Sequence, residues 1–291
     1  MPALPLLLAV PNVSEGADRD AIGALGAAFA PARLLDVHSD PDHGRSVFTI
    51  AARQGELAAA LVGGAREAAA RIDLTRHGGA HPHVGALDVA PVVYLDEADR
   101  GAAVAEALTA AALIGDDAGL PVFLYGQLAT AGDRRERADL RRGGTAGLAE
   151  RGLAPDFGPR ELDPRSGAVL VTARPPLVAF NVDLATGDLE LARAIAAELR
   201  ESGGGPPGVR AIGLVLAGRG RAQVSLNVHD HRAAPLAELV ARVAARAPVA
   251  ELELVGLAPA AALAGLPPEL PLRNFDPGRH VIENALGSAE A

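Results

Sequence analysis

The feature that most constrains the fold is an order of expected strands and helices that occurs twice along the chain. In the first half, helical spacing of apolar residues alternates with short apolar runs that end at proline, glycine or polar turns. The order is strand, helix, strand, strand, helix, strand, over residues 3–10, 17–30, 33–37, 46–51, 55–71 and 87–95. This order is typical of the ferredoxin-like split βαβ unit, an α+β fold.

The second half repeats the same order, over residues 177–184, 187–201, 209–217, 222–228, 235–247 and 252–257. Between the halves we expect a helix at 103–118, a strand at 121–125 and an irregular stretch at 152–176 that is rich in Pro, Gly and charge. Such a long connection in a compact domain indicates a linker plus a functional loop. We therefore predict two α/β subdomains, 1–176 and 177–291, with a ligand bound between them.

Composition excludes several classes of chemistry. The chain has no cysteine and no lysine, since all 27 of its basic residues are arginine. It therefore has no disulfide, thiolate nucleophile, Cys-ligated zinc or lysine Schiff base. A net charge of −9 and only 3% aromatic residues argue against nucleic-acid binding. No apolar run reaches the roughly 18 residues of a membrane span, so we expect a cytoplasmic protein that binds no membrane.

The histidine-rich stretch at residues 77–88, HGGAHPHVGALD, is the first candidate for chemistry. Its glycines and proline indicate a loop that leads into a strand. Three interpretations remain open. It is a solvated surface loop, or a zinc or iron site made by His81, His83, Asp88 and His38, or a proton-transfer site, because imidazole titrates near neutral pH.

Two further polar segments are candidates. The segment PNVSEG at 11–16 follows the first strand, and it either caps the next helix or uses Asn12 and backbone N–H groups to hold a carboxylate. The turn DPDHGRS at 40–46 is an ordinary polar hairpin or presents Arg45 as a carboxylate clamp. We interpret the arginine run at 134–142 as a solvated helix face, or as a surface for a polyanionic tail.

Taken together, these segments resemble a known family. In chain order they read VPNVSEG, LLDVHSDPDHGRSVFT, HGGAHPHVGALDVAPVV, PVFLYG, APDFGP, AFNVDL, AQVSLNVHD, ELVGLAP and RHVIENAL. They are similar to the formiminotransferase domain of glutamate formimidoyltransferases. The likeness runs from about Val10 to about Leu286, which is nearly the whole chain.

The resemblance implies a fold and an activity. The fold is two ferredoxin-like α/β subdomains in a homodimer, with mixed or antiparallel sheets, helices on one face and a folate cleft between the subdomains. The activity is transfer of a formimidoyl group between N-formimidoyl-L-glutamate and tetrahydrofolate, in histidine degradation and one-carbon metabolism. The expected partners are therefore folate and a glutamate derivative. No metal and no following cyclodeaminase domain are expected.

The family's motifs also imply site residues. Its H-P-x-x-G-A-L-D-V motif places the catalytic histidine at His81, which would act as general acid and base. Its folate loop maps to Gly158, Pro159, Arg160, Glu161, Leu162, Asp163, Pro164, Arg165, Ser166 and Gly167. We name a further set as substrate-binding or supporting residues: Asn12, His38, Asp40, Arg45, His83 and Asp88.

Two positions depart from the family pattern. His38 stands where the family usually has an acidic residue, so Asp36 or Asp40 would have to replace that acid. Gly44 stands where an asparagine usually precedes Arg45. These departures keep open a related folate-dependent formyl or other one-carbon transferase, or a folate- or amino-acid-binding protein without catalysis. A metal-dependent hydrolase that uses His81 and His83 is a further alternative.

Overall fold

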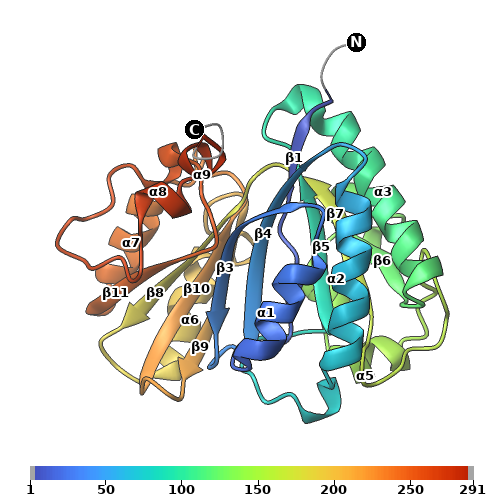
Figure 1. Ribbon diagram of the computed structural model, residues 1–291. Coiled ribbons are helices and arrows are strands. Elements are labelled where there is room, and N and C mark those ends of the chain that lie inside the picture. Colours follow the sequence, from blue (N-terminus) through green and yellow to red (C-terminus); the bar gives the residue numbers. More distant parts are fainter. Residues whose placement is uncertain (1–3, 288–291) are drawn as a thin grey trace. The chain divides into compact units, whose positions relative to one another are not determined.

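The computed structural model describes residues 4–287 of the chain. Its contacts divide the chain between Pro175 and Pro176 into two compact units, each built around one sheet (Figure 1). Of the described residues, no helix is both long and apolar enough to cross a membrane.

The first unit contains a mixed sheet. Its strands are β1 (Leu6–Ala9), β2 (Asn12–Val13), β3 (Arg33–Asp40), β4 (Arg45–Arg53), β5 (Leu87–Val93), β6 (Val122–Leu124) and β7 (Val169–Arg174). Across the sheet the order is β3, β4, then β1 and β2 together, β5, β7 and β6. The pairings from β3 to β5 are antiparallel, and β7 pairs in parallel with both β5 and β6.

The position of β7 corrects one expectation. We expected an irregular stretch at residues 152–176, but its end forms a strand inside the sheet. Residues 169–173 are buried, because the strand has a neighbour on each edge and side chains packed on both faces. A fully buried parallel strand is a short continuous apolar run without alternation, so periodicity does not reveal it.

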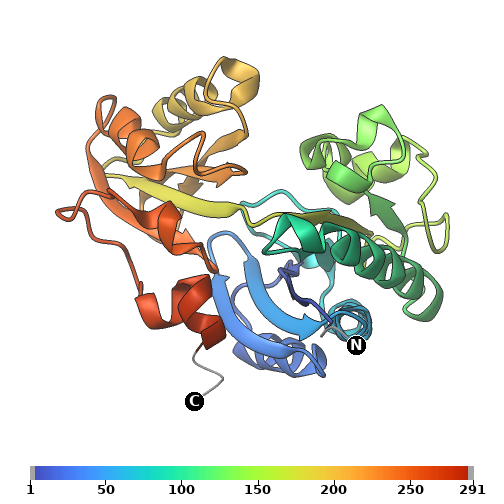
Figure 2. The same ribbon diagram turned by 90° about the horizontal axis from the view of Figure 1, so that it is seen from above.

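Helices cover both faces of this sheet, so the expectation of helices on one face does not hold for the first unit. The helices are α1 (Arg19–Ala28), α2 (Leu57–Arg71), α3 (Arg100–Asp117), α4 (Arg137–Leu140) and α5 (Gly144–Glu150). Residues of α1, α2 and α3 form the main core with one face (Figure 1). Leu140 and Leu148 pack with Phe123 and Leu170 on the opposite face, so α3 and the α4–α5 region lie on opposite sides of β6 and β7 (Figure 2).

The second unit has four antiparallel strands in the order β11, β8, β10, β9. The strands are β8 (Val178–Leu184), β9 (Val209–Leu216), β10 (Arg221–Val228) and β11 (Val249–Val255). The helices are α6 (Leu189–Leu199), α7 (Leu236–Ala244), α8 (Pro277–His280) and α9 (Ile282–Gly287). The strand–helix order predicted for each half is therefore confirmed.

The core of the first unit depends on close helix–helix contact. Phe29 follows α1, and its ring lies 5.2 Å from the ring of Phe48, centroid to centroid. The same ring packs on Gly64 of α2, where an added Cβ would come within 2.0 Å of it. Gly23 of α1, by contrast, is exposed and has open space where a Cβ would be.

We predict opposite effects of the same substitution in these two helices. Gly64→Ala should lower the free energy of unfolding by about 1–3 kcal/mol, because the Phe29 ring must move in a packed core. Gly23→Ala, the matched control, should raise it by about 0.5–1 kcal/mol, because alanine favours a helix interior. Urea unfolding followed by circular dichroism measures both. Equal effects at the two positions would contradict the packing described.

Candidate active site

The centre of the candidate site is the carboxylate of Asp88 on β5, which is fully buried. Its Oδ2 accepts a hydrogen bond of 2.8 Å from NH1 of Arg45 and another from NH2 of Arg141. Its Oδ1 accepts a hydrogen bond of 2.9 Å from the backbone N–H of Val84. One carboxylate therefore joins β5 to β4, to the end of α4 and to the loop that precedes β5.

Charge balance decides the protonation of this cluster. Burial by itself would raise the pKa of Asp88, but Arg141 and Arg45 outweigh it and hold that pKa well below its usual range. Burial lowers the pKa of Arg141 to about 9, so its guanidinium remains charged at neutral pH. Two buried guanidinium groups thus face one carboxylate, and the cluster keeps a net positive charge.

Arg45 is held by Asn12 as well as by Asp88. Its Nε and NH2 both donate to Oδ1 of Asn12, at 3.0 and 2.8 Å. Nδ2 of Asn12 donates in turn to the carbonyl of Val10 at 2.8 Å, which orients the amide. Asn12 lies in β2 between β4 and β5, and α1 begins only at Arg19. The cap of α1 is the side chain of Asp18, which follows this segment, so residues 12–16 do not themselves begin the helix.

His81 lies against this cluster and is half-buried. Its Nδ1 is 2.8 Å from the carbonyl oxygen of Pro82 and 3.3 Å from NH1 of Arg45. A carbonyl can only accept a hydrogen bond, so the shorter contact assigns the hydrogen of the neutral ring to Nδ1 and leaves a lone pair on Nε2. Burial, together with the charges of Arg45 and Arg141, lowers the pKa of His81 well below its ordinary value. The ring is therefore neutral at physiological pH.

Backbone hydrogen bonds join the loop of His81 to the turn between β3 and β4. The N–H of Ala80 donates to the carbonyl of Asp42 at 3.0 Å. The N–H of His81 donates to the carbonyl of His43 at 3.3 Å. The two loops thus form one hydrogen-bonded unit, which fixes His43 beside His81.

Two glycines make this contact possible. Gly44 has a φ of +62°, and an added Cβ would come within 2.7 Å of Nε2 of His77 and 2.8 Å of Cα of Gly79. A Cβ on Gly79 would come within 2.3 Å of the carbonyl oxygen of His43. Asparagine tolerates this φ better than other non-glycine residues, but here His77 fills the space that its side chain needs. The departure from the family at Gly44 thus has a local steric reason.

Four histidines gather in these loops. The rings of His43 and His81 lie 6.4 Å apart, and those of His77 and His83 lie 4.1 Å apart, centroid to centroid. Nδ1 of His43 is 3.2 Å from Oδ1 of Asp40. Among residues 4–287, no group of three or more His, Asp or Glu residues is arranged to hold a metal ion.

His38 does not join the central cluster. It lies on β3 opposite Val47 of β4, and it is half-buried. Within the described part of the chain, it is not among the hydrogen-bonding partners of His81 or Asp88. Of the two acids that could replace the family's acid, Asp40 lies in the turn of the histidine cluster, with its Oδ1 3.2 Å from Nδ1 of His43.

The predicted folate loop is anchored at both ends by glycines with positive φ. An added Cβ on Gly158 would come within 2.3 Å of the carbonyl oxygen of Leu120. An added Cβ on Gly167 would come within 2.1 Å of the carbonyl oxygen of Val84, which lies next to the histidine loop. Residues 159–165 between them are exposed, apart from the half-buried Leu162. The end of this loop therefore lies beside the segment that carries His83 into β5.

Arg141 is a site residue that sequence reasoning missed. We expected the arginine run to be a solvated helix face, but Arg141 is only 8% exposed and binds Asp88. Its neighbour Arg142 is exposed and pairs with Asp139. No spacing in the run distinguishes the two, because α4 is one short turn and Gly143 and Gly144, both with positive φ, end it.

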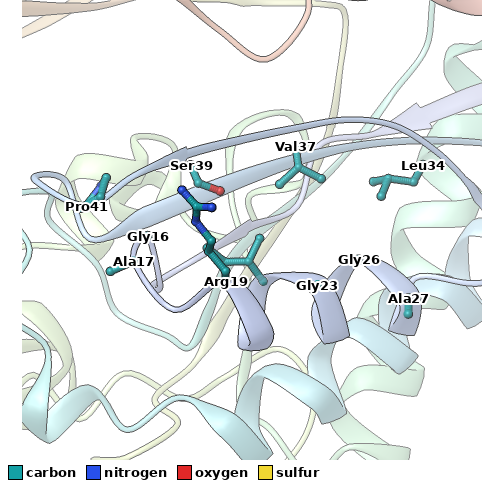
Figure 3. A pocket seen from close by; sticks show the side chains of 11 residues that line it. Gly16, Ala17, Arg19, Gly23, Gly26, Ala27, Leu34, Val37, Ser39 and Pro41 are labelled. Atoms are coloured by element: carbon teal, nitrogen blue, oxygen red, sulfur yellow. The ribbon is translucent and has the colours of Figure 1, made fainter.

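A separate groove of about 740 Å³ lies between α1 and the edge strand β3 (Figure 3). It is lined mainly by small and apolar residues, among them Gly23, Gly26, Leu34 and Val37, and also by Arg19. None of the predicted site residues lines it. It is therefore distinct from the cluster around Asp88.

Comparison with known proteins gives the family. The family model of the N-terminal subdomain of the formiminotransferase domain matches residues 6–174, and that of the formiminotransferase domain matches residues 179–268. The chain belongs to the formiminotransferase family. Each of the two family models falls within one of the two structural units.

Relatives in this family extend over nearly the whole chain. A glutamate formimidoyltransferase of Streptococcus pyogenes is 36% identical over 290 residues, which cover 95% of this chain and 97% of that protein. One of Thermoplasma acidophilum is 34% identical and covers 98% and 99%. A formimidoyltransferase-cyclodeaminase of the pig is 37% identical over 89% of this chain, but the match spans only 51% of that longer protein.

We predict that Asp88→Asn lowers the free energy of unfolding by about 3–5 kcal/mol. The change leaves two buried guanidinium groups without their carboxylate. Asp139→Asn removes the carboxylate of an exposed pair with Arg142 and should cost no more than about 1 kcal/mol. Chemical denaturation of both variants measures the difference. Equal stability of the two would contradict the central role of Asp88.

Proposed function

We propose that this protein is a glutamate formimidoyltransferase that moves the formimidoyl group of N-formimidoyl-L-glutamate to tetrahydrofolate. Support comes from the family match over both units and from near-full-length relatives of that name. The observation that carries the proposal is the neutral imidazole of His81, held against a buried cluster of net positive charge. Such a group can accept and return a proton at neutral pH.

The reaction needs two proton transfers. N5 of tetrahydrofolate attacks the formimidoyl carbon, and a tetrahedral intermediate forms. Glutamate then leaves as its amine, so N5 must lose a proton and the departing nitrogen must gain one. Nε2 of His81 carries the lone pair that can take the first proton, because Nδ1–H points to the Pro82 carbonyl. General acid–base catalysis of this kind contributes about 10²–10⁴-fold to the rate.

The other residues of the cluster have supporting roles in this proposal. Asp88 and Asn12 hold Arg45, Arg141 binds the same carboxylate, and burial together with the charges of Arg45 and Arg141 keeps the His81 ring neutral. Asn12 and Asp88 take three of the five N–H donors of Arg45 and hold the guanidinium inside the cluster, so we favour this role over direct binding of a substrate carboxylate.

Other features of the family extend the proposal. We propose that the exposed loop at 158–167 contacts the folate, as its position beside the histidine loop supports. Both units would be ferredoxin-like subdomains, because the four strands of the repeated order are arranged alike in both sheets. Across each sheet, the fourth of these strands in chain order lies beside the first, the first beside the third, and the third beside the second. A cytoplasmic homodimer that acts in histidine degradation and uses no metal completes the proposal.

The first test is a product assay with His81→Ala. Purified protein is mixed with tetrahydrofolate and N-formimidoyl-L-glutamate, and free glutamate and 5-formimidoyltetrahydrofolate are both quantified. We expect equal amounts of the two products, and a kcat about 10²–10⁴-fold lower in His81→Ala with folate affinity nearly unchanged. Folate binding without turnover by the wild type would overturn the proposed activity. A formyl donor in place of the formimidoyl donor provides the control for the transferred group.

The pH dependence of kcat/KM tests the state of His81. A base must be unprotonated to act, and the pKa of His81 is lowered. Activity should therefore persist as the pH falls through 6.5, the ordinary value for histidine, and decline only at a lower pH. Initial rates at subsaturating donor concentration, measured from pH 5 to 8 in buffers of constant ionic strength, give the acid limb of the pH profile of kcat/KM. An acid limb centred near pH 7 would show that His81 is not the neutral base.

A further inference from the structure

The donor of the proposed reaction carries two carboxylates, and the cations at the centre of the site already have a partner. N-formimidoyl-L-glutamate has an α-carboxylate beside the reacting nitrogen and a second carboxylate at the end of its side chain. Arg45 and Arg141 both bind Asp88, and Arg45 also binds Asn12. A carboxylate that leaves water needs a charged or hydrogen-bonding partner, so other groups must bind the donor.

Arg137 lies one helical turn from Arg141 on the same side of α4. The N–H of Arg141 donates to the carbonyl of Arg137 at 3.1 Å. Residues four apart in a helix are neighbours on one face, so Arg137 projects on the side on which Arg141 reaches Asp88. The segment before α4 is fixed as well, because the N–H of Gly126 donates to the carbonyl of Arg135 at 3.2 Å.

Arg174, the last residue of β7, lies on the face of the sheet that α4 covers. Alternate residues of a strand share a face, and Leu170 of β7 packs with Leu140 of α4. Arg141, which binds Asp88, follows Leu140 directly. The side chain of Arg174, four residues after Leu170, is therefore directed to the same side of the sheet as the buried cluster.

Neither Arg137 nor Arg174 has an acidic partner. In the described part of the chain, Arg174 donates to the carbonyl of Pro175 at 2.9 Å, and no carboxylate pairs with it or with Arg137. Both side chains are half-buried, so each still reaches solvent. Partial burial of an unpaired charge is unfavourable, and a bound carboxylate would offset that cost.

The charge of Arg137 acts on both His81 and Arg174. Burial is the main cause that lowers the pKa of His81, and the charges of Arg45, Arg141 and Arg137 add to it. Burial also lowers the pKa of Arg174 to about 10, and the charge of Arg137 again contributes. Arg137 is thus within electrostatic range of the proton-transfer group and of the guanidinium at the end of β7.

We propose that Arg137 and Arg174 bind the two carboxylates of the formimidoyl donor and make the site selective for a glutamate derivative. The inference rests on the proposed function. Arg137 takes the α-carboxylate, because it is one turn from Arg141 and acts on His81. Arg174, at the end of its strand, takes the side-chain carboxylate. Each guanidinium can donate two parallel hydrogen bonds to a carboxylate, which orients the donor with its formimidoyl carbon at His81.

Three donors separate the two contacts. N-formimidoyl-L-glutamine keeps the α-carboxylate and has an uncharged amide in place of the other one. N-formimidoyl-4-aminobutyrate lacks the α-carboxylate and keeps the other one. We expect the wild type to prefer the glutamate donor over each analogue by about 10- to 100-fold in kcat/KM, because a charge-assisted hydrogen bond is lost. Release of the amine product at saturating tetrahydrofolate measures the rates.

Each arginine should affect only the donors that carry its carboxylate. Arg174→Gln should lower kcat/KM about 10- to 100-fold for the glutamate and aminobutyrate donors, mainly through KM, and leave the glutamine donor within about threefold of wild type. Arg137→Gln should do the same for the glutamate and glutamine donors and spare the aminobutyrate donor. Arg135→Gln, which changes an exposed arginine before α4, is the control and should keep wild-type values with all three.

The pattern over the donors excludes a merely structural effect. Equal losses with all three donors in a variant would overturn the role of that arginine, because a damaged fold does not distinguish them. A raised KM for tetrahydrofolate with an unchanged KM for the donor would also overturn it, and would assign the arginine to the glutamate tail of the folate. Circular dichroism verifies folding. If a glutamine variant does not fold, the methionine variant, which keeps the apolar stem, replaces it.

The wild type alone distinguishes this inference from the proposed function. Activity with equal kcat/KM for the three donors would overturn the inference and leave the proposed transferase intact. A wild type that is inactive with every donor would overturn the proposed function and the inference with it.

Discussion

The buried carboxylate of Asp88 is the contact on which the rest of the site depends. It binds Arg45 of β4, Arg141 after α4 and the backbone of Val84, and through Arg45 it is linked to Asn12 of β2. A buried charge without partners is costly, so these elements must assemble together. The buried carboxylate thus connects the sheet to the loop that precedes β5, and this connection fixes the position of His81 in that loop.

The buried cluster around Asp88 also explains the protonation state of His81. Two guanidinium groups and one carboxylate leave a positive charge next to His81, and that charge together with burial lowers the pKa of the imidazole. The Pro82 carbonyl holds Nδ1–H, so the lone pair lies on Nε2. On the other side, Nδ1 of His43 lies 3.2 Å from Oδ1 of Asp40. A site built from arginine, aspartate and histidine can therefore hold a neutral imidazole for proton transfer without lysine or cysteine.

Much of this arrangement follows from sequence, and the exceptions have physical reasons. The repeated element order and the cluster members Arg45, His81 and Asp88 were predictable, because each sits in a motif or at a strand end. Arg141 was not, since an exposed and a buried arginine look alike in a one-turn helix. The strand β7 was not predictable either, because a central parallel strand lacks the alternation of apolar and polar residues. The contact between the loops of Gly44 and Gly79 is long-range and leaves no local signal beyond the glycines.

The central claim is that His81 is a neutral imidazole with its hydrogen on Nδ1, kept so by the Asp88 cluster. The most direct measurement is a 15N NMR titration of protein with labelled histidine, resolved by comparison with His81→Ala. The account predicts a pKa below 6.5 for His81 and, in the neutral state, a shift pattern in which Nδ1 is protonated and Nε2 is not. A pKa at or above 6.5, or a hydrogen on Nε2 in the neutral ring, would contradict it.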